Sequence, residues 1–95
     1  MKIKTMAWDA AANLKTKKDR AAYLALAFDE GDAALITAAL GDIARSEGMA
    51  KIARKTGLGR ESLYKALSTN GNPELATLLK VFNAIGLKLQ AVPGQ

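Results

Sequence analysis

Apolar side chains recur at intervals of three and four residues along most of this chain, and glycines separate the periodic stretches. That spacing is typical of amphipathic helices, because residues three or four apart lie on the same helical face. Leu24 and Phe28 share one such face, and Leu78 and Phe82 share another. The pattern predicts five helices, over residues 17–30, 33–47, 49–56, 60–67 and 73–85.

Capping residues mark the ends of these helices. Thr16 and Asp19 resemble a capping box, and Asp32 is a good N-cap for the second helix. Asn72 is predicted to cap the fifth helix, with Pro73 at its first position, where the missing N–H costs nothing. Four glycines are placed to end helices: Gly31, Gly48, Gly57 and Gly86.

The last apolar stretch has a different period. Residues 87–92 alternate like a strand, with Leu87, Leu89 and Ala91 on one face. A lone strand is unstable, so this segment needs a partner, either residues 2–6 of the same chain or the same segment of a second copy. We favour the second copy, because residues 2–6 alternate weakly and an antiparallel pair across a two-fold axis would bury both edges. The sequence therefore predicts a homodimer formed through this strand.

Composition limits the chemistry that the chain can perform. It has 95 residues, enough for one small domain, and 49% of them are hydrophobic, enough for a core. It has no cysteine and no histidine, which excludes disulfides, thiolate or imidazole metal sites and Ser-His catalysis. No apolar run is long enough to span a membrane, and the N-terminus lacks a signal-peptide pattern. We therefore expect a cytoplasmic protein that is not an enzyme, without metal, cofactor, small-molecule substrate or membrane partner.

The net charge of +5 is unevenly distributed. Residues 31–47 hold three acidic side chains and one basic, a local charge of −2, whereas residues 48–70 hold five basic and one acidic, a local charge of +4. Lysine and arginine gathered in this way release counterions from nucleic acid when they bind its phosphates. The basic stretch is therefore a candidate nucleic-acid contact, although many charged faces are simply solvated.

This basic stretch contains two short predicted helices, residues 49–56 and 60–67, joined by the turn Gly57-Leu58-Gly59. Two helices joined by a short turn that contains glycine are the outline of a helix-turn-helix. In that motif the start of the second helix lies in the DNA major groove and needs polar side chains. The predicted DNA contacts are Lys51, Arg54, Lys55, Gly59, Arg60, Glu61, Ser62, Tyr64 and Lys65.

Each polar side chain of the second helix has a chemical role in this hypothesis. Arg60 and Lys65 could donate to guanine, and Glu61 could accept from a cytosine amine. Ser62 and Tyr64 could reach phosphates or bases, while the basic side chains and N-terminal amides of the preceding helix could hold a phosphate. The alternative is an ordinary helical hairpin with a solvated basic face. A phosphate-binding loop at the glycine turn is disfavoured, because no strand precedes it and no Gly-Lys-Ser follows.

Residues 48–85 resemble the lambda-repressor-like (XRE-type) DNA-binding domain. The resemblance rests on Ile52-Ala53, Gly57-Leu58, residues 60–65, Asn72-Pro73 and residues 78–80. More narrowly, the chain resembles the addiction-module antidote proteins, the HigA-like antitoxins. The matching stretches, in order along nearly the whole chain, are residues 8–11, 22–24, 31–32, 38–45, 48–49, 57–67 and 71–73.

This resemblance implies an all-α fold, a five-helix lambda-repressor-like domain with a short C-terminal β-strand. Residues 1–31 would form an N-terminal segment and first helix, and residues 32–95 the DNA-binding part with its dimerisation strand. The resemblance also implies an antitoxin that neutralises a RelE/ParE-like toxin and represses their shared operon by binding double-stranded operator DNA. Two positions depart from the family: Gly59 replaces the usual Ser or Thr cap, and Ala50-Lys51 replaces the usual Thr or Ser followed by Gln.

Toxin contacts are predicted outside the second helix of the motif, at Trp8, Tyr23 and Phe28. Aromatic residues make up only 5% of the chain, and these three precede the helix-turn-helix. The alternative is that Trp8 and Phe28 pack on the core. Two other functions fit the same residues: a stand-alone phage-type repressor without a toxin, and a protein-interaction module that keeps the fold without binding DNA.

Overall fold

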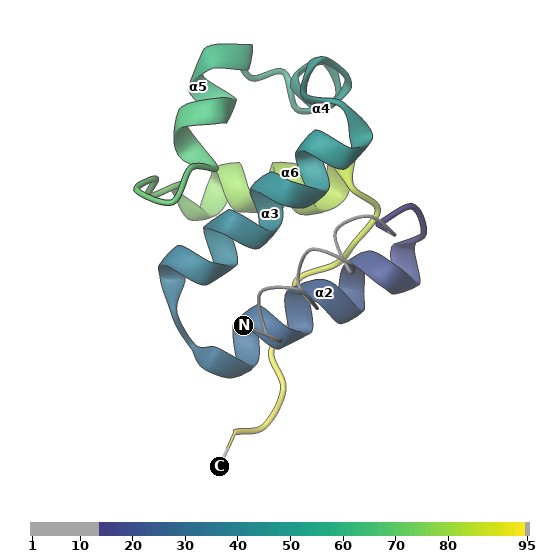
Figure 1. The fold of residues 1–95 in the computed structure, drawn as a ribbon, viewed down its shortest axis with the longest axis vertical. Coiled ribbons are helices and arrows are strands. Elements are labelled where there is room, and N and C mark those ends of the chain that lie inside the picture. Colours follow the sequence, from purple (N-terminus) through teal and green to yellow (C-terminus); the bar gives the residue numbers. More distant parts are fainter. Residues whose placement is uncertain (1–13, 95) are drawn as a thin grey trace, which may run out of the picture.

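This computed structural model describes residues 14–94 of the chain. They form five helices and no strand, so the prediction of an all-α fold is confirmed for this part of the chain. The helices, shown in Figure 1, are α2 (Lys17–Glu30), α3 (Ala33–Glu47), α4 (Met49–Thr56), α5 (Arg60–Ala66) and α6 (Leu75–Ala84).

The predicted ends of the first helices are confirmed, because the expected capping groups make the expected bonds. The Thr16 hydroxyl oxygen accepts a hydrogen bond from the Asp19 amide at 3.0 Å, and the Asp32 carboxylate accepts one from the Ala34 amide at 2.9 Å. Gly31 follows α2 with a φ of 69°, the left-handed conformation that glycine adopts without strain. The tight connection between α2 and α3 therefore comes directly from local sequence.

The start of the last helix differs from the prediction. Asn72 was expected to cap it, but α6 begins at Leu75, and its N-cap, Glu74, makes no side-chain capping bond. The reason lies at the end of α5, where a β-carbon on Gly71 would stand 2.2 Å from the Ala66 carbonyl oxygen. The chain therefore leaves α5 in close contact with it and is still extended at Glu74, with φ −68° and ψ 158°.

The C-terminal segment forms no strand in the described single chain. Leu87 and Leu89 are half-buried and pack against the core, whereas Ala91 and Val92 are exposed. Figure 1 shows this segment passing beside α2 toward the C-terminus. The alternating pattern therefore places two leucines on the core within one chain, and the predicted strand is not confirmed.

A single core joins the five helices. α2 contributes Leu24, which is 2% exposed. The largest fully buried side chains are Leu14, Leu40, Ile43, Ile52, Leu63, Leu67, Val81 and Ile85. α2 and α3 pack as a helical hairpin, and α4 contacts α3, α5 and α6. In Figure 1 the α2–α3 turn lies at the opposite end of the molecule from α4 and α5.

Candidate nucleic-acid interface

α4 and α5 are held to the core by a few buried side chains. Ile52 and Leu63 are each 0% exposed, and they anchor the two short helices from below. Gly57 turns the chain with a φ of 76°. Thr56 fixes this turn, because its hydroxyl donates to the Ile52 carbonyl at 2.8 Å and accepts from the Leu58 amide at 3.3 Å. The outward faces of α4 and α5 are thus set by local packing.

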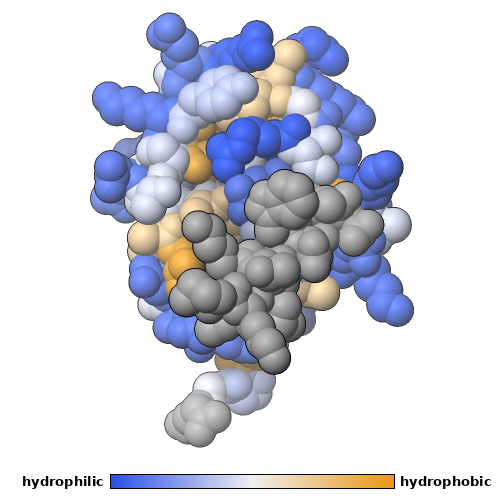
Figure 2. Space-filling model, in the orientation of Figure 1, coloured by the Kyte–Doolittle hydropathy of each residue, from blue (hydrophilic) through white to orange (hydrophobic). Residues whose placement is uncertain are grey.

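The outward face of α5 is polar, as the sequence predicted. The five side chains proposed for base or phosphate contact are all exposed: Arg60, Glu61, Ser62, Tyr64 and Lys65. Gly59 is the N-cap and provides no side-chain bond, which agrees with its departure from the usual Ser or Thr. Figure 2 shows hydrophilic side chains along the upper part of the molecule, where α4 and α5 lie.

Arg60 and Tyr64 contact each other on this face. The Arg60 guanidinium carbon lies 5.9 Å from the centroid of the Tyr64 ring, within the range of a cation–π interaction. Such a contact restricts both side chains without removing the guanidinium donors from solvent. The arrangement leaves Arg60 able to form the paired hydrogen bonds that guanine accepts.

The three basic side chains of α4 are in different surroundings. Lys51 forms an ion pair with Glu47 at 3.3 Å, and the Lys55 ammonium donates a long hydrogen bond of 3.5 Å to the Ala84 carbonyl. Arg54 is exposed. All three residues are exposed, but Lys51 and Lys55 already have partners within the chain, which they would have to share with a phosphate or release.

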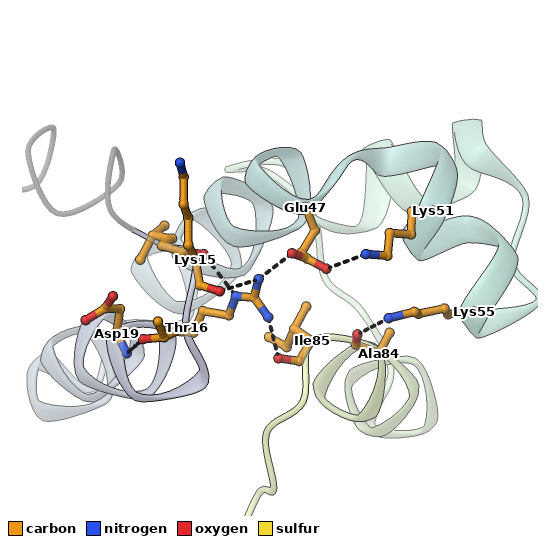
Figure 3. Close-up of polar contacts among 10 residues, drawn as sticks. Lys15, Thr16, Asp19, Glu47, Lys51, Lys55, Ala84 and Ile85 are labelled. Atoms are coloured by element: carbon orange, nitrogen blue, oxygen red, sulfur yellow. Dashed lines mark hydrogen bonds and ion pairs between the residues drawn. The ribbon is translucent and has the colours of Figure 1, made fainter.

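A buried arginine that was not among the predicted residues pairs with Glu47, the partner of Lys51. Arg20 of α2 is only 7% exposed, and its guanidinium pairs with Glu47. It also donates to the Leu14 and Ile85 carbonyls, both at 3.0 Å, and to the Lys15 carbonyl at 3.4 Å. Figure 3 shows these contacts, with Glu47 between them and Lys51.

One signal in the sequence could have revealed Arg20. It stands four residues before Leu24 and seven before Ala27, on the face of α2 that is buried. A charged residue at such a position needs partners, because burying a charge alone is costly. The partners of Arg20 come from the residues just before α2, from the residue just after α6 and from α3. Spacing along the sequence therefore could not identify them.

Glu47 stays ionised in this network. Burial by itself raises the pKa of its carboxyl, but the hydrogen bond from Lys51 and the charges of Arg20 and Lys51 outweigh burial. The pKa therefore lies below its usual value. The ionised Glu47 carboxylate of α3 therefore pairs with Arg20 of α2 and Lys51 of α4, which connects the three helices.

Two of the three residues predicted to contact a toxin, Tyr23 and Phe28, lie on α2. The Tyr23 hydroxyl donates to Asp42 at 2.6 Å, and burial together with this bond raises the pKa of Tyr23 to about 12. Phe28 is 42% exposed, and its ring packs on Phe82 with the centroids 6.4 Å apart. Trp8 lies outside the described residues. Tyr23 is thus tied to α3, while Phe28 is only partly covered by α6.

Residues 14–94 contain neither a membrane span nor a cluster of metal ligands. None of the helices there has the length and apolar character needed to cross a bilayer. In the same residues, acidic side chains do not gather in threes as they would around a metal ion.

Residues 14–94 thus form an all-helical fold with a basic, polar pair of short helices at one end. A family described as "probable addiction module antidote protein" matches residues 4–93, and the chain belongs to this family. A Haemophilus influenzae (strain Rd) protein named "uncharacterized protein" is 46% identical over 83 residues, which cover 87% of this chain and 86% of that protein. No solved structure matches the chain.

Family membership confirms the coarser part of the resemblance seen in the sequence. The chain is an antidote-type protein of an addiction module, a class whose general partner is a toxin. The description of the family names neither a class of toxin nor a DNA-binding domain.

Proposed function

We propose that this chain is the antidote of a toxin–antidote pair and also represses the promoter of that pair by binding double-stranded operator DNA. Family membership supports the antidote role. The resemblance to HigA-like antitoxins supports a RelE/ParE-like toxin as the partner. The α4–α5 surface supports the DNA-binding role.

One observation carries the DNA-binding proposal: α5 buries only Leu63 and presents its polar residues to solvent directly after a tight turn. A helix that enters the major groove needs this division between its two faces. Arg60 and Lys65 are proposed to read bases, with Glu61, Ser62 and Tyr64 as additional contacts beside the Gly59 cap. Arg54 is proposed as the phosphate contact from α4, with Lys51 and Lys55 adding positive charge nearby.

Operator binding is expected to depend on Arg60 and Lys65 together. Each base contact contributes about 1–3 kcal/mol, so the double variant Arg60→Ala/Lys65→Ala should lose at least about 2 kcal/mol, or about 30-fold in affinity. The measurement is a gel shift with the DNA that lies upstream of the gene. Lys15→Ala/Lys18→Ala is the control, because it removes the same charge at exposed positions outside α4, α5 and the proposed dimer segment.

The control separates base recognition from general attraction to phosphates. It should weaken binding much less than Arg60→Ala/Lys65→Ala. Equal losses from the two double variants would contradict the proposed position of α5. A wild-type chain that does not bind this DNA at all would leave a protein-interaction module as the better description.

Assembly is part of the proposal, because one short helix reads few base pairs. A homodimer through residues 87–92 would present two copies of α5 to two half-sites about 34–36 Å apart. Leu87, Leu89 and Ala91 are the proposed dimer residues. The segment borders a groove of about 350 Å³ lined by apolar residues of α2 and α6, which a second copy could cover.

A dimer is expected by light scattering at micromolar concentration, and Leu89→Pro should convert it to a monomer because proline removes a backbone donor. Lys88→Ala, which keeps that donor, is the control. A wild-type monomer that still binds a two-fold symmetric operator tightly would contradict this assembly.

A stand-alone phage-type repressor is the second candidate function. It is favoured by the same observation, since the α4–α5 surface needs no toxin to contact DNA. Co-purification with the product of the adjoining reading frame separates the two candidates. The antidote proposal requires that complex, and the stand-alone repressor does not form it.

A further inference from the structure

We propose that the antidote binds its toxin through the outer face of the α2–α3 hairpin, with Leu26 and Leu35 as the apolar anchors. The proposal rests on the antidote function proposed above. The partner that fits this face is a basic protein surface with an apolar centre.

The hydrogen bond between Tyr23 and Asp42 defines the outer face. It joins α2 and α3 at 2.6 Å. Residues on the Tyr23 side of α2 and on the Asp42 side of α3 therefore face the same side of the hairpin. Leu26 lies one helical turn after Tyr23, and Leu35 lies two turns before Asp42. Because the two helices run in opposite directions, both steps lead toward the α2–α3 turn. The two leucines therefore flank one surface near that turn.

Both leucines are exposed although they are large and apolar. Leu26 is 65% exposed and Leu35 is 46% exposed. Figure 2 shows apolar side chains at the left edge of the molecule, near the start of α3. Exposed apolar side chains that share one surface and have charged neighbours are typical of a protein-binding site.

Charge identifies the kind of partner. The hairpin, residues 17–47, holds six acidic and four basic side chains, a net charge of −2, and its basic residues lie away from the turn. Nearer the turn, residues 21–41 hold Asp29, Glu30 and Asp32 and no lysine or arginine, whereas Asp42 pairs with Arg45. Asp29 and Glu30 are exposed at the end of α2. In a chain whose net charge is +5, this hairpin is the acidic region, and it would repel nucleic acid and attract a basic protein.

A second exposed pair makes the assignment more specific. Leu75 and Leu79 of α6 are 63% and 49% exposed, nearly the same as Leu26 and Leu35. They lie beside Lys80, and residues 75–88 contain two lysines and no acidic residue. Exposure alone does not distinguish the two pairs, but complementarity to a basic partner favours the hairpin.

The position of this surface has a consequence for the DNA-binding proposal. The α2–α3 turn lies at the far end of the molecule from α4 and α5 (Figure 1). A partner on the hairpin would therefore leave the outward face of α5 uncovered. Toxin and operator are expected to bind at the same time.

The test uses the full chain and the product of the reading frame that adjoins its gene, with affinity measured by calorimetry. The variant Leu26→Lys/Leu35→Lys should weaken the complex by about a hundredfold, because it removes both apolar anchors and adds charge that repels a basic partner. Leu75→Lys/Leu79→Lys is the matched control and should bind as wild type does. Both variants change only exposed positions, and their folding is checked by circular dichroism and by operator gel shift.

The outcomes separate the docking surface from the antidote function. Wild-type affinity in Leu26→Lys/Leu35→Lys overturns the docking surface while leaving the antidote function intact. A wild-type chain that forms no complex with the neighbouring product overturns both. A charge variant, Glu30→Lys, gives a second readout that does not involve the leucines: it should weaken binding at low salt and lose most of that effect at high salt. Unchanged low-salt affinity in this variant would also overturn the proposal.

Discussion

Replacing Arg20 by methionine is expected to lower the free energy of unfolding by about 3–5 kcal/mol. Methionine keeps much of the side-chain length but leaves Glu47 without its buried counter-charge. It also removes the donors that satisfy the Leu14, Lys15 and Ile85 carbonyls. Urea denaturation followed by circular dichroism measures the loss.

Arg45→Met is the matched control for this prediction. Arg45 also pairs with a carboxylate, Asp42, at 2.8 Å, but its side chain is 51% exposed. An exposed pair contributes about 0–1 kcal/mol, because water solvates both charges when the pair is broken. Similar losses of unfolding free energy in Arg20→Met and Arg45→Met would show that burial does not make the Arg20 contacts more stabilising than an exposed ion pair.

Ile52→Ala is expected to cost about 2–5 kcal/mol, the second large effect. Ile52 is 0% exposed and lies in α4, which contacts α3, α5 and α6. Removing its side chain leaves a cavity that so short a helix can fill only by shifting. Because α4 carries the turn that leads into α5, operator affinity of the folded molecules should fall as well.

Two further variants test whether lost packing is the cause. Ile52→Val removes a single methylene and should cost only about 0.5–1.5 kcal/mol. Leu75→Ala changes a side chain that is 63% exposed, so its effect should stay within about 0.5 kcal/mol. An Ile52→Ala chain as stable as Leu75→Ala would contradict the view that α4 depends on this contact.

The helices could be predicted from the sequence where local chemistry decides. Thr16 and Asp32 cap helices through their own side chains, and Gly31 adopts a φ that few other residues tolerate. The start of α6 could not be predicted in the same way. It depends on how closely Gly71 approaches the end of α5, which is a tertiary contact and leaves no periodic pattern.

In the candidate site, too, features set by local sequence could be predicted, and features set by tertiary contacts could not. Lys65 stands two residues after Leu63 and so lies on the opposite face of α5, which spacing predicts. Arg60 is exposed as the first residue of α5. The ion pair of Lys51 with Glu47 and the contact of Lys55 with Ala84 depend on neighbouring helices. The strand expected at residues 87–92 does not form in the single chain for a related reason. Leu87 and Leu89 pack against the core of their own chain, which is a tertiary contact.

The bond between Arg20 and the Ile85 carbonyl joins positions 65 residues apart in the chain. A ribosome that adds about 5–20 residues per second needs roughly 3–13 seconds to make the chain between them. During that interval α2 and its Arg20 have been made, but Ile85, which follows α6 and accepts the hydrogen bond of Arg20, has not. A nascent chain interrupted anywhere before residue 85 cannot close this contact, so synthesis must pass the last helix before the molecule is complete.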